Sequence, residues 1–535
     1  MTYKKVSSAN VSISSSAADL ESNSSDNLLD FDNGVVTYLQ EPEEAPQGRH
    51  LGLFSTIILF VSRILGSGFL AISSGMYNDC GRSPFIFLLS WSVASILAFC
   101  GLFVYLELGS LIPRSGGTKV FLEFIYNKPH MMVSVVISLY SVMFGFTISN
   151  LLVFGEYCLH ALNIEPTTFR TRFAGLALLY VVCAFHGISV KHGVKVQDFI
   201  GLMKLILAGI IVGTGIWVNL FPYSVTHVEY QVKPEEFFPP KTAVSFSSFA
   251  SAVIKGTFAY GGWNSVHTVT NEIKDPVRTL KIAGPVALSI ISLTYLVINF
   301  TYLAVIPSDE IAKSGQLIGS ILFEKVFGYH FGRQFLTLSS AICTGGNVFV
   351  VLYTISRVSQ EVFREGYLPF SSFMASNWPR DAPLPTLLLS CAFSTFIIVA
   401  SPGGDVYNYV VSLESYPQQI FVALCAIGIF VIRYKYPDVI PPIRSSLVGT
   451  SLVILISAYL IIMPLTSSHP NPPGMETWIP YTYLGLLSLF LCFTYWLFMF
   501  VIGPFLGKYT LFAEEFQQED GLVVKKWVKN HVREL

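Results

Sequence analysis

Two glycines, Gly66 and Gly68, stand in the otherwise apolar stretch SRILGSGFLAISSG. Glycine lowers helix propensity and lets the backbone leave helical geometry without a side-chain clash. If the helix unwinds here, carbonyls near Ile64 and Leu65 form a negative helix end, and the next amides, from Ser67 onward, form a positive one. Because carbonyls can hold an ammonium group and amides a carboxylate, the two ends together match a zwitterion. The alternative is that the glycines form a close packing face between helices.

A second pair of glycines interrupts another apolar stretch, FAYGGWN, at residues 258–264. Interrupted membrane segments at matching places in two halves of a chain are the best sequence pointer to a midplane site in an inverted-repeat transporter. Two such breaks make helix packing alone the weaker explanation. They predict a binding site for a small dipolar molecule between the two segments.

The elements that hold these breaks are expected to be membrane-spanning helices, because 52% of the residues are hydrophobic and only 13% are charged. Soluble domains carry about 25% charged residues, and a membrane span needs about 20 apolar ones. The chain is therefore predicted to be an all-α membrane protein with 12 transmembrane helices. The windows are 51–77, 84–112, 131–160, 173–190, 196–221, 247–269, 282–306, 334–356, 384–400, 404–432, 446–464 and 481–504.

The distribution of Lys and Arg predicts the orientation, since positive residues stay on the cytoplasmic side during insertion. With both termini in the cytoplasm, most Lys and Arg fall in cytoplasmic segments. We therefore expect four regions. These are a cytoplasmic tail at 1–49, an inverted-repeat core at 50–440, helices 11 and 12 at 441–504, and a second cytoplasmic tail at 505–535.

The two tails differ in composition. Residues 1–49 are rich in serine and acidic residues and lack the apolar core of a secretory signal, so we expect them to be disordered. The simplest interpretation is a solvated tail. A sharper one is a platform for phosphorylation and for ubiquitination at Lys4 and Lys5, with a ubiquitin-ligase adaptor as partner. The end of the second tail, GLVVKKWVKNHVREL, is interpreted as a short amphipathic helix at the membrane surface.

Several kinds of chemistry are excluded by what the sequence lacks. The eight cysteines show neither CxxC nor Cys/His ligand spacing, so neither a disulfide framework nor a metal site is indicated. The chain has no GxxxxGK[ST] loop, GxSxG or HExxH motif. We therefore expect neither an ATP-driven pump nor an enzyme, and no catalytic residues. We expect no cofactor and no nucleic-acid partner.

The motifs at the breaks also resemble a known family. SRILGSGF looks like the first-helix signature of the amino acid, polyamine and organocation (APC) superfamily, and FAYGGWN is similar to the sixth-helix signature of its L-type amino acid transporters. Within that family, YLELGSLIPRSGGTKVFLEFIYNKP and the acidic tail most resemble fungal high-affinity methionine permeases. The resemblance implies a LeuT-like 5+5 inverted repeat in which helices 1 and 6 are broken.

The resemblance also implies a set of site residues. The substrate carboxylate would meet the amides of Ser67 and Gly68, and its ammonium would meet the carbonyls of Ile64, Phe258 and Gly261. Phe258 would also act as an aromatic gate. Asn347 either lines the side-chain pocket or is a satisfied amide of the bundle. The expected substrate-binding residues are Ile64, Leu65, Gly66, Ser67, Gly68, Phe258, Ala259, Tyr260, Gly261 and Asn347.

Two lysines within the predicted spans are functional hypotheses, because charges inside a membrane are costly. Lys204, in VQDFIGLMK, matches a lysine that resembles a built-in replacement for sodium in sodium-independent members of the superfamily. We therefore expect sodium-independent transport, with Lys204 as a candidate proton carrier. Lys255 is expected to face an outer vestibule, with Glu156 and Glu414 among its candidate partners.

Arg63 directly precedes the first break and is the third intramembrane cation. It is expected either to close a cytoplasmic gate by pairing with Glu107 or Asp198, or to extend into an aqueous vestibule. Glu107 itself is interpreted as architectural rather than as a coupling group.

These observations predict a multi-pass plasma-membrane importer of neutral L-amino acids, with L-methionine favoured and protons as the coupling ion. The lipid bilayer and the substrate are its expected partners. The loop NIEPTTFR lacks the cysteine that would join a heavy chain, so we expect no disulfide-linked heavy chain. The alternatives are a broader neutral amino acid exchanger or permease, and an amino acid sensor that does not transport.

Overall fold

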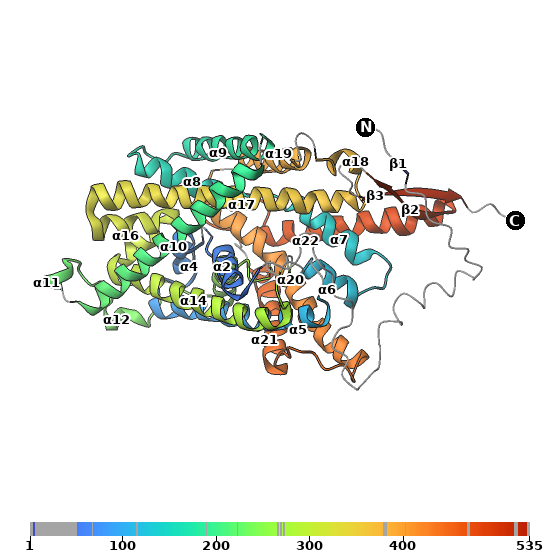
Figure 1. The fold of residues 1–535 in the computed structure, drawn as a ribbon. Helices are drawn as coiled ribbons and strands as arrows, with labels where there is room; N and C mark the ends of the chain where they lie inside the picture. Colours follow the sequence, from blue (N-terminus) through green and yellow to red (C-terminus); the bar gives the residue numbers. More distant parts are fainter. Residues whose placement is uncertain are drawn as a thin grey trace.

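The computed structural model describes residues 4–5, 51–66, 68–113, 116–188, 190–221, 223–264, 267, 270, 273–377, 382–401, 403–467, 471–517 and 523–531. Most of these residues are helical, as the apolar windows predict. Figure 1 shows long helices lying side by side, with the strands β1 (Lys4–Lys5), β2 (Tyr509–Gln517) and β3 (Val523–His531) at one end of the bundle. Helices α11 (Tyr223–Thr226) and α12 (Pro234–Phe237) lie at the other end.

Within the described residues, nine helical segments are long and apolar enough to cross a membrane. This supports a multi-pass membrane protein. An apolar helix of 17 residues, α19 (Leu384–Ala400), falls just below that length. The helices of the nine segments are α5 (Pro84–Leu111), α7 (Met132–Met143) with α8 (Ile148–Ala161), α9 (Thr168–Ile188), α10 (Val190–Leu220), α14 (Pro276–Val305), α16 (Ile318–Phe327) with α17 (Thr337–Arg364), α20 (Val406–Lys435), α21 (Leu447–Ile462) and α22 (Tyr481–Trp496) with α23 (Gly503–Gly507).

Two of the predicted windows are interrupted where their glycines stand. Along the first, α2 (Leu53–Ile64) ends before Gly66, and the chain resumes as α3 (Gly68–Ala71) and α4 (Ser73–Asp79). Along the second, α13 (Phe246–Ala259) ends two residues before Gly261 and is followed by a turn. The remaining short helices are α6 (Thr118–Ile125), α15 (Ser308–Lys313) and α18 (Ser371–Met374).

A third interruption was not expected, because the window 131–160 reads as one apolar helix. The structure divides it into α7 and α8 around Gly145. A Cβ on Gly145 would lie 2.9 Å from Cγ2 of Ile355, so this glycine lets the bend pack closely against α17. The bend has a functional consequence, since it turns Phe146 and Thr147 towards the central cavity described below.

Residues 523–531 of the C-terminal tail form a strand and not an amphipathic helix, so that prediction is wrong for this segment, and the fold is not purely α-helical. β2 and β3 form an antiparallel hairpin, which β1 extends to a three-stranded sheet. Val524 is buried, and the indole Nε1 of Trp527 donates to the carbonyl of Glu365 at 3.0 Å. Val524 and Trp527 are three positions apart, so they point to opposite faces of the strand. The strand contacts the end of α17 through Trp527 and through Lys525, whose Nζ lies 3.0 Å from Oε2 of Glu365.

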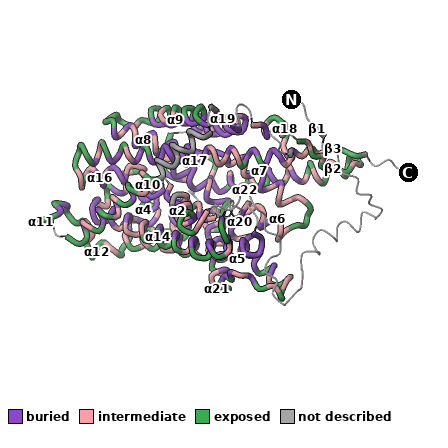
Figure 2. Tube along the Cα trace, viewed as in Figure 1, coloured by how far each residue is buried: buried purple, intermediate pink, exposed green. Residues whose placement is uncertain are grey.

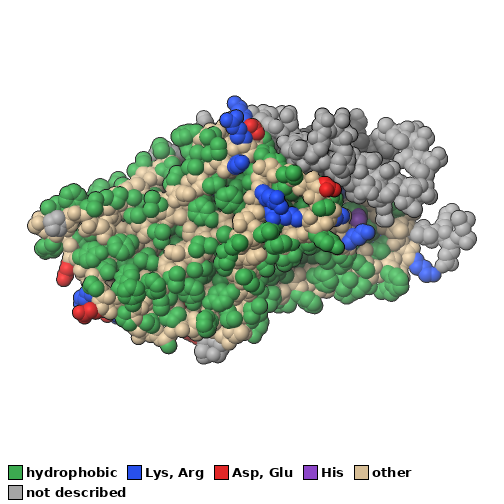
Figure 3. Space-filling model, turned by 90° about the horizontal axis from the view of Figure 1, so that it is seen from below, with side chains coloured by type: hydrophobic (Ala, Val, Ile, Leu, Met, Phe, Trp, Pro, Cys, Tyr) green, Lys and Arg blue, Asp and Glu red, His purple; other side chains and the backbone are tan. Residues whose placement is uncertain are grey.

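The core and the outer surface are both apolar, as expected for a protein solvated by lipid. Figure 2 shows buried residues concentrated in the middle of the bundle, along α8, α17 and α20. Figure 3 shows hydrophobic side chains over most of one outer face, with the charged ones at one end and in the opposite half. Such an exterior is what a bilayer requires.

Candidate binding site at the two helix breaks

The two breaks face a common cavity of about 380 Å³. Its volume lies within the range of roughly 300–1,000 Å³ that small-molecule sites occupy. Ile64, Gly66 and Gly68 line it from the first break. Phe258, Ala259, Tyr260 and Gly261 line it from the second, and Asn347 from α17.

Two glycines allow the broken segments to touch. A Cβ on Gly68 would lie 2.9 Å from Cα of Ala259, so any side chain there would push the second segment away. Gly262 has a φ of +111°, and a Cβ on it would lie 2.9 Å from the carbonyl oxygen of Arg63. Backbone groups of both segments therefore meet in a way that only glycine permits at these positions.

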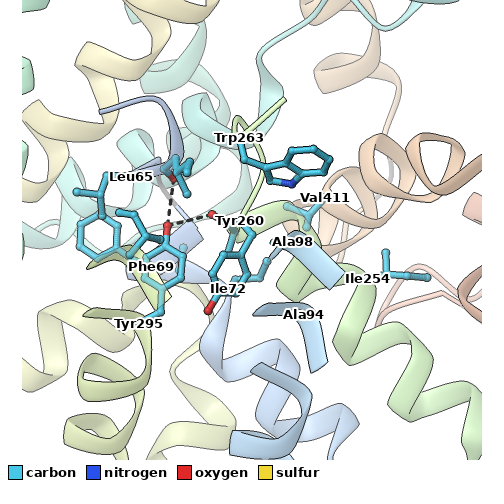
Figure 4. Close-up of a cluster of buried hydrophobic side chains, with 14 of the residues drawn as sticks. Leu65, Phe69, Ile72, Ala94, Ala98, Ile254, Tyr260, Trp263, Tyr295 and Val411 are labelled. Atoms are coloured by element: carbon cyan, nitrogen blue, oxygen red, sulfur yellow. Dashed lines mark hydrogen bonds between the residues drawn. The ribbon is translucent and has the colours of Figure 1, made fainter. Parts of the chain in front are cut away.

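A tyrosine from α14 joins the two helix ends. The hydroxyl of Tyr295 lies 3.1 Å from the carbonyl oxygen of Ile64 and 2.9 Å from that of Ala259, and dashed lines mark hydrogen bonds at this tyrosine in Figure 4. These carbonyls belong to the last residues of α2 and α13. Because a hydroxyl has one proton, it serves the two carbonyls in turn. The Ile64 carbonyl also accepts from the amide of Gly66 at 2.7 Å.

Replacing Tyr295 with Phe should weaken substrate binding without unfolding the protein. The change removes the donor that holds the ends of α2 and α13 together at the cavity, so the carbonyls there lose their fixed position. We expect substrate binding to weaken by the size of one buried polar contact, about 1 to 3 kcal/mol. We expect KM for uptake to rise about five- to 150-fold, since tenfold corresponds to about 1.4 kcal/mol. The matched control is Tyr416→Phe, because the Tyr416 hydroxyl donates to Ile461 at 2.8 Å, outside the cavity. Equal KM values for the two variants would contradict this role.

Not every residue of the expected binding set lines the cavity. Leu65 is 3% exposed, packs in the hydrophobic core and is not among the lining residues. Ser67 lies outside the described residues. The other eight members of the set line the cavity, as given above. Breaks in the chain thus bring residues about 190 positions apart in sequence to one site.

Lys204 is buried and is not among the residues that line the cavity, although it contacts one of them. Its Nζ donates to Oδ1 of Asn347, and the side chain is 4% exposed. The bond leaves Nδ2 of Asn347 buried without a hydrogen-bond partner among the described residues. That Nδ2 lies 3.9 Å from the place of a Cβ on Gly66, so the side chain of Asn347 lies between Lys204 and the first break. The two interpretations of Asn347 are therefore compatible, since its oxygen is satisfied inside the bundle while its residue lines the cavity.

Arg63 does not pair with Glu107, so that expectation is wrong. Nε and Nη2 of Arg433 donate to the Glu107 carboxylate at 3.0 and 2.7 Å, and Ser445 donates to it from its amide at 2.7 Å. A carboxylate so enclosed has an architectural role, as proposed for Glu107. Arg63 lines the cavity, and its Nη1 lies 3.5 Å from Oγ1 of Thr354. The side chain of Asp198 lies outside the described part of the chain.

Lys255 pairs with Asp79 rather than with Glu156 or Glu414, so those candidate partners are wrong. Its Nζ lies 2.5 Å from Oδ2 of Asp79, and the side chains are 4% and 24% exposed. The pair joins α4, which follows the first break, to α13, which precedes the second. Asp79 was missed because it lies two residues beyond the first apolar window, 51–77, whereas Lys255 lies inside the sixth.

One wall of the cavity was missed by sequence reasoning altogether. It comes from the start of α8 and the middle of α20. Four buried oxygens in it have no hydrogen-bond partner among the described residues, namely Oγ1 of Thr147, Oδ1 of Asn150, Oε1 of Glu414 and Oε1 of Gln419. A carboxyl in the apolar window 404–432 was the available signal, and it was interpreted only as a partner for Lys255.

The cavity therefore has main-chain dipoles at the two breaks, and its other walls are lined by apolar and amide side chains. It has the parts to hold a small zwitterion. Within the described residues, no group of three or more His, Cys, Asp and Glu side chains is placed to hold a metal ion.

The chain resembles proteins whose activity is named. A model of the amino acid permease family matches residues 51–491. The low-affinity methionine permease of Saccharomyces cerevisiae is 41% identical over 91% of this chain and 89% of its own length. The high-affinity methionine permease of the same yeast is 31% identical over 93% and 88%. Identity is thus higher to the low-affinity protein than to the high-affinity type that the motifs resemble.

A more distant relative is the large neutral amino acids transporter small subunit 2 of Mus musculus, which is 29% identical over 82% of this chain and 81% of its own length. The family match covers both breaks, the cavity and most of the helices described above. On this match and on the identity to the yeast proteins, the chain belongs to the amino acid permease family of the APC superfamily.

Proposed function

We propose that the protein is a secondary active transporter of the plasma membrane that imports neutral L-amino acids, with L-methionine as the main substrate. The observation that carries this proposal is the cavity at the meeting point of two interrupted membrane segments. Methionine is favoured because two relatives at 41% and 31% identity are named methionine permeases.

The proposed architecture has twelve spans. The nine long apolar segments and α19 supply ten of them, and the two interrupted segments supply the first and the sixth. The first five and the next five would form the inverted repeats of a LeuT-like core, with α21 and α22 outside it. In this arrangement both termini lie in the cytoplasm, where Lys4 and Lys5 would be accessible to a ubiquitin-ligase adaptor.

The proposed substrate pose uses the main chain for the amino acid head. The carboxylate accepts from amides at the first break, including that of Gly68. The ammonium meets the carbonyls of Ile64, Phe258 and Gly261. The side chain then extends among apolar lining residues such as Phe146 and Val422. Apolar pockets separate close analogues by only about 1 to 3 kcal/mol. Other apolar amino acids should therefore compete with methionine.

We propose sodium-independent proton symport as the driving reaction. Lys204 supports sodium independence, because its ammonium already supplies a fixed positive charge behind the first break. A broader neutral amino acid exchanger or permease is the second candidate. The likeness to the mouse relative, which is named a large neutral amino acids transporter, favours the broader substrate range. A sensor would bind the amino acid without moving it.

The test is uptake of radiolabelled methionine by cells that lack their own methionine permeases. We expect accumulation above the external concentration, stimulation in acidic medium, abolition by a protonophore, and equal rates in sodium and choline buffers. Reconstituted vesicles separate the alternatives. An exchanger fills them only when they are preloaded with amino acid, and a sensor does not fill them at all. A strict sodium requirement would contradict the proposed coupling.

A further inference from the structure

We propose that Glu414 carries the cotransported proton, an inference that rests on the proposed proton symport. Glu414 lies on α20, within the cavity lining. Its Oε1 is buried and has no hydrogen-bond partner among the described residues. The cavity thus contains a carboxyl group that is neither ion-paired nor solvated at that oxygen.

The groups around Glu414 do not neutralise it. Within the described residues, no ion pair includes Glu414. Tyr140 of α7, whose ring lies 5.0 Å from that of Phe421 on α20, has a buried hydroxyl without a partner in the same described part. Arg63 lines the same cavity, but the hydrogen bond that the structure gives it goes to Thr354.

Charged groups on the helices packed against α20 are either ion-paired with another residue or outside the cavity lining. These helices are α5, α6, α8, α13, α21 and α22, and the last two carry no Asp, Glu, Lys or Arg. Glu156 of α8 is outside the cavity lining. The ion pairs of the others are Glu107 with Arg433, Lys119 with Glu123, and Lys255 with Asp79.

Binding of an apolar side chain would then favour protonation of Glu414. Glu414 as a whole is only partly buried and lines the cavity, so water in an empty cavity can reach the carboxylate away from Oε1, whereas methionine displaces that water. Burying an unpaired carboxylate is far more costly than burying the neutral acid. The proton and methionine therefore stabilise each other in the cavity, and by linkage each raises the affinity of the other by the same factor.

The proton balance of this cycle is simple. A proton from the external medium adds to the Glu414 carboxylate as methionine enters. The same proton leaves to the cytoplasm once methionine has left and water again reaches the carboxyl. Lys204 is the less suitable carrier, because its Nζ is held by Oδ1 of Asn347 behind the cavity. No other reactant is required.

The experiment measures methionine binding to the purified full chain by calorimetry, at several pH values and in buffers of different ionisation enthalpy. Wild-type protein should take up about one proton per methionine, so its Kd should rise by up to about tenfold per pH unit where Glu414 is ionised in the empty protein. Glu414→Gln should bind methionine with a Kd that does not vary with pH and without proton uptake. Glu156→Gln is the matched control, because it removes a carboxyl outside the cavity and should behave as the wild type.

The outcomes separate this inference from the proposed function. Wild-type binding without proton uptake, or proton uptake that persists in Glu414→Gln, overturns the role of Glu414 and leaves methionine transport standing. Failure of the wild type to bind any neutral amino acid overturns the proposed function itself. If Glu414→Gln does not fold, Glu414→Asp keeps a titratable carboxyl at the site. It should retain proton uptake with a shifted pH dependence, and a pH-independent Kd in that variant overturns the inference.

Discussion

Gly262→Val should abolish amino acid uptake even where the protein reaches the membrane in normal amount. Gly262 has a φ of +111°, and a Cβ there would lie 2.9 Å from the carbonyl oxygen and 3.1 Å from the carbonyl carbon of Arg63. A β-branched residue in that backbone region costs about 1 to 3 kcal/mol before any clash is counted. The clash adds to this, because main-chain atoms of the first break cannot rotate away as a flexible side chain can.

The expected consequence is that the two breaks move apart and the carbonyls near Ile64 and Ala259 lose their common position. Uptake rate and surface amount should be measured together, with the rate per molecule falling more than about tenfold, which corresponds to about 1.4 kcal/mol. Gly213→Val on α10 is the matched control, since a Cβ on Gly213 meets nothing within 4 Å. It should transport like the wild type. Normal uptake by Gly262→Val would show that the breaks need not touch.

How much of this site could be read from the sequence depends on whether the main chain or the side chains build it. Glycine pairs in apolar windows predict the breaks at Gly66 and Gly261, because helix propensity and hydropathy are local properties. The break at Gly145 was missed for a related reason. A single glycine in an apolar helix is common, and here its role depends on Ile355 of another helix.

The ion-pair partners could not be predicted, because they depend on how helices are rotated against one another. Glu107 could pair with several cations by sequence alone, and only the packing of α5 against α20 places it at Arg433. Glu414 was misassigned for the same reason. Its position in an apolar window marks it as unusual, but whether it faces Lys255, lipid or the cavity is a property of the bundle.

The C-terminal hairpin shows a different limit. The apolar residues of VVKKWVKNH stand at 523, 524, 527 and 528, a helical spacing, which is why the sequence favours a helix there. The strand prevails because β2 supplies a partner with the register Tyr509↔His531, and because Lys525 reaches Glu365 at 3.0 Å. Short segments of this kind are decided by tertiary contacts rather than by propensity.

Breaking the Lys255–Asp79 pair on one side should destabilise the protein strongly, whereas removing both charges should not. Nζ and Oδ2 lie 2.5 Å apart, with Lys255 4% exposed. Removing one partner of a buried pair leaves an uncompensated charge, which costs about 3 to 5 kcal/mol, and replacing both with apolar residues of similar size is often neutral. We therefore expect Lys255→Met and Asp79→Leu each to lower the melting temperature and the uptake rate, and the double variant to recover much of both.

The control pair joins α12 to the loop before α13, where Lys241 Nζ is 2.8 Å from Glu236 Oε2 with side chains 39% and 46% exposed. Exposed pairs contribute only about 0 to 1 kcal/mol, so Lys241→Met should hardly change the melting temperature. Comparing the two single variants with the double variant also tests function, because Lys255 and Asp79 connect the two broken segments. If the double variant regains stability but not uptake, the charges act in the transport cycle as well as in the fold. If each single variant is as stable as the wild type, the pair is not the buried link between α4 and α13 that the geometry indicates.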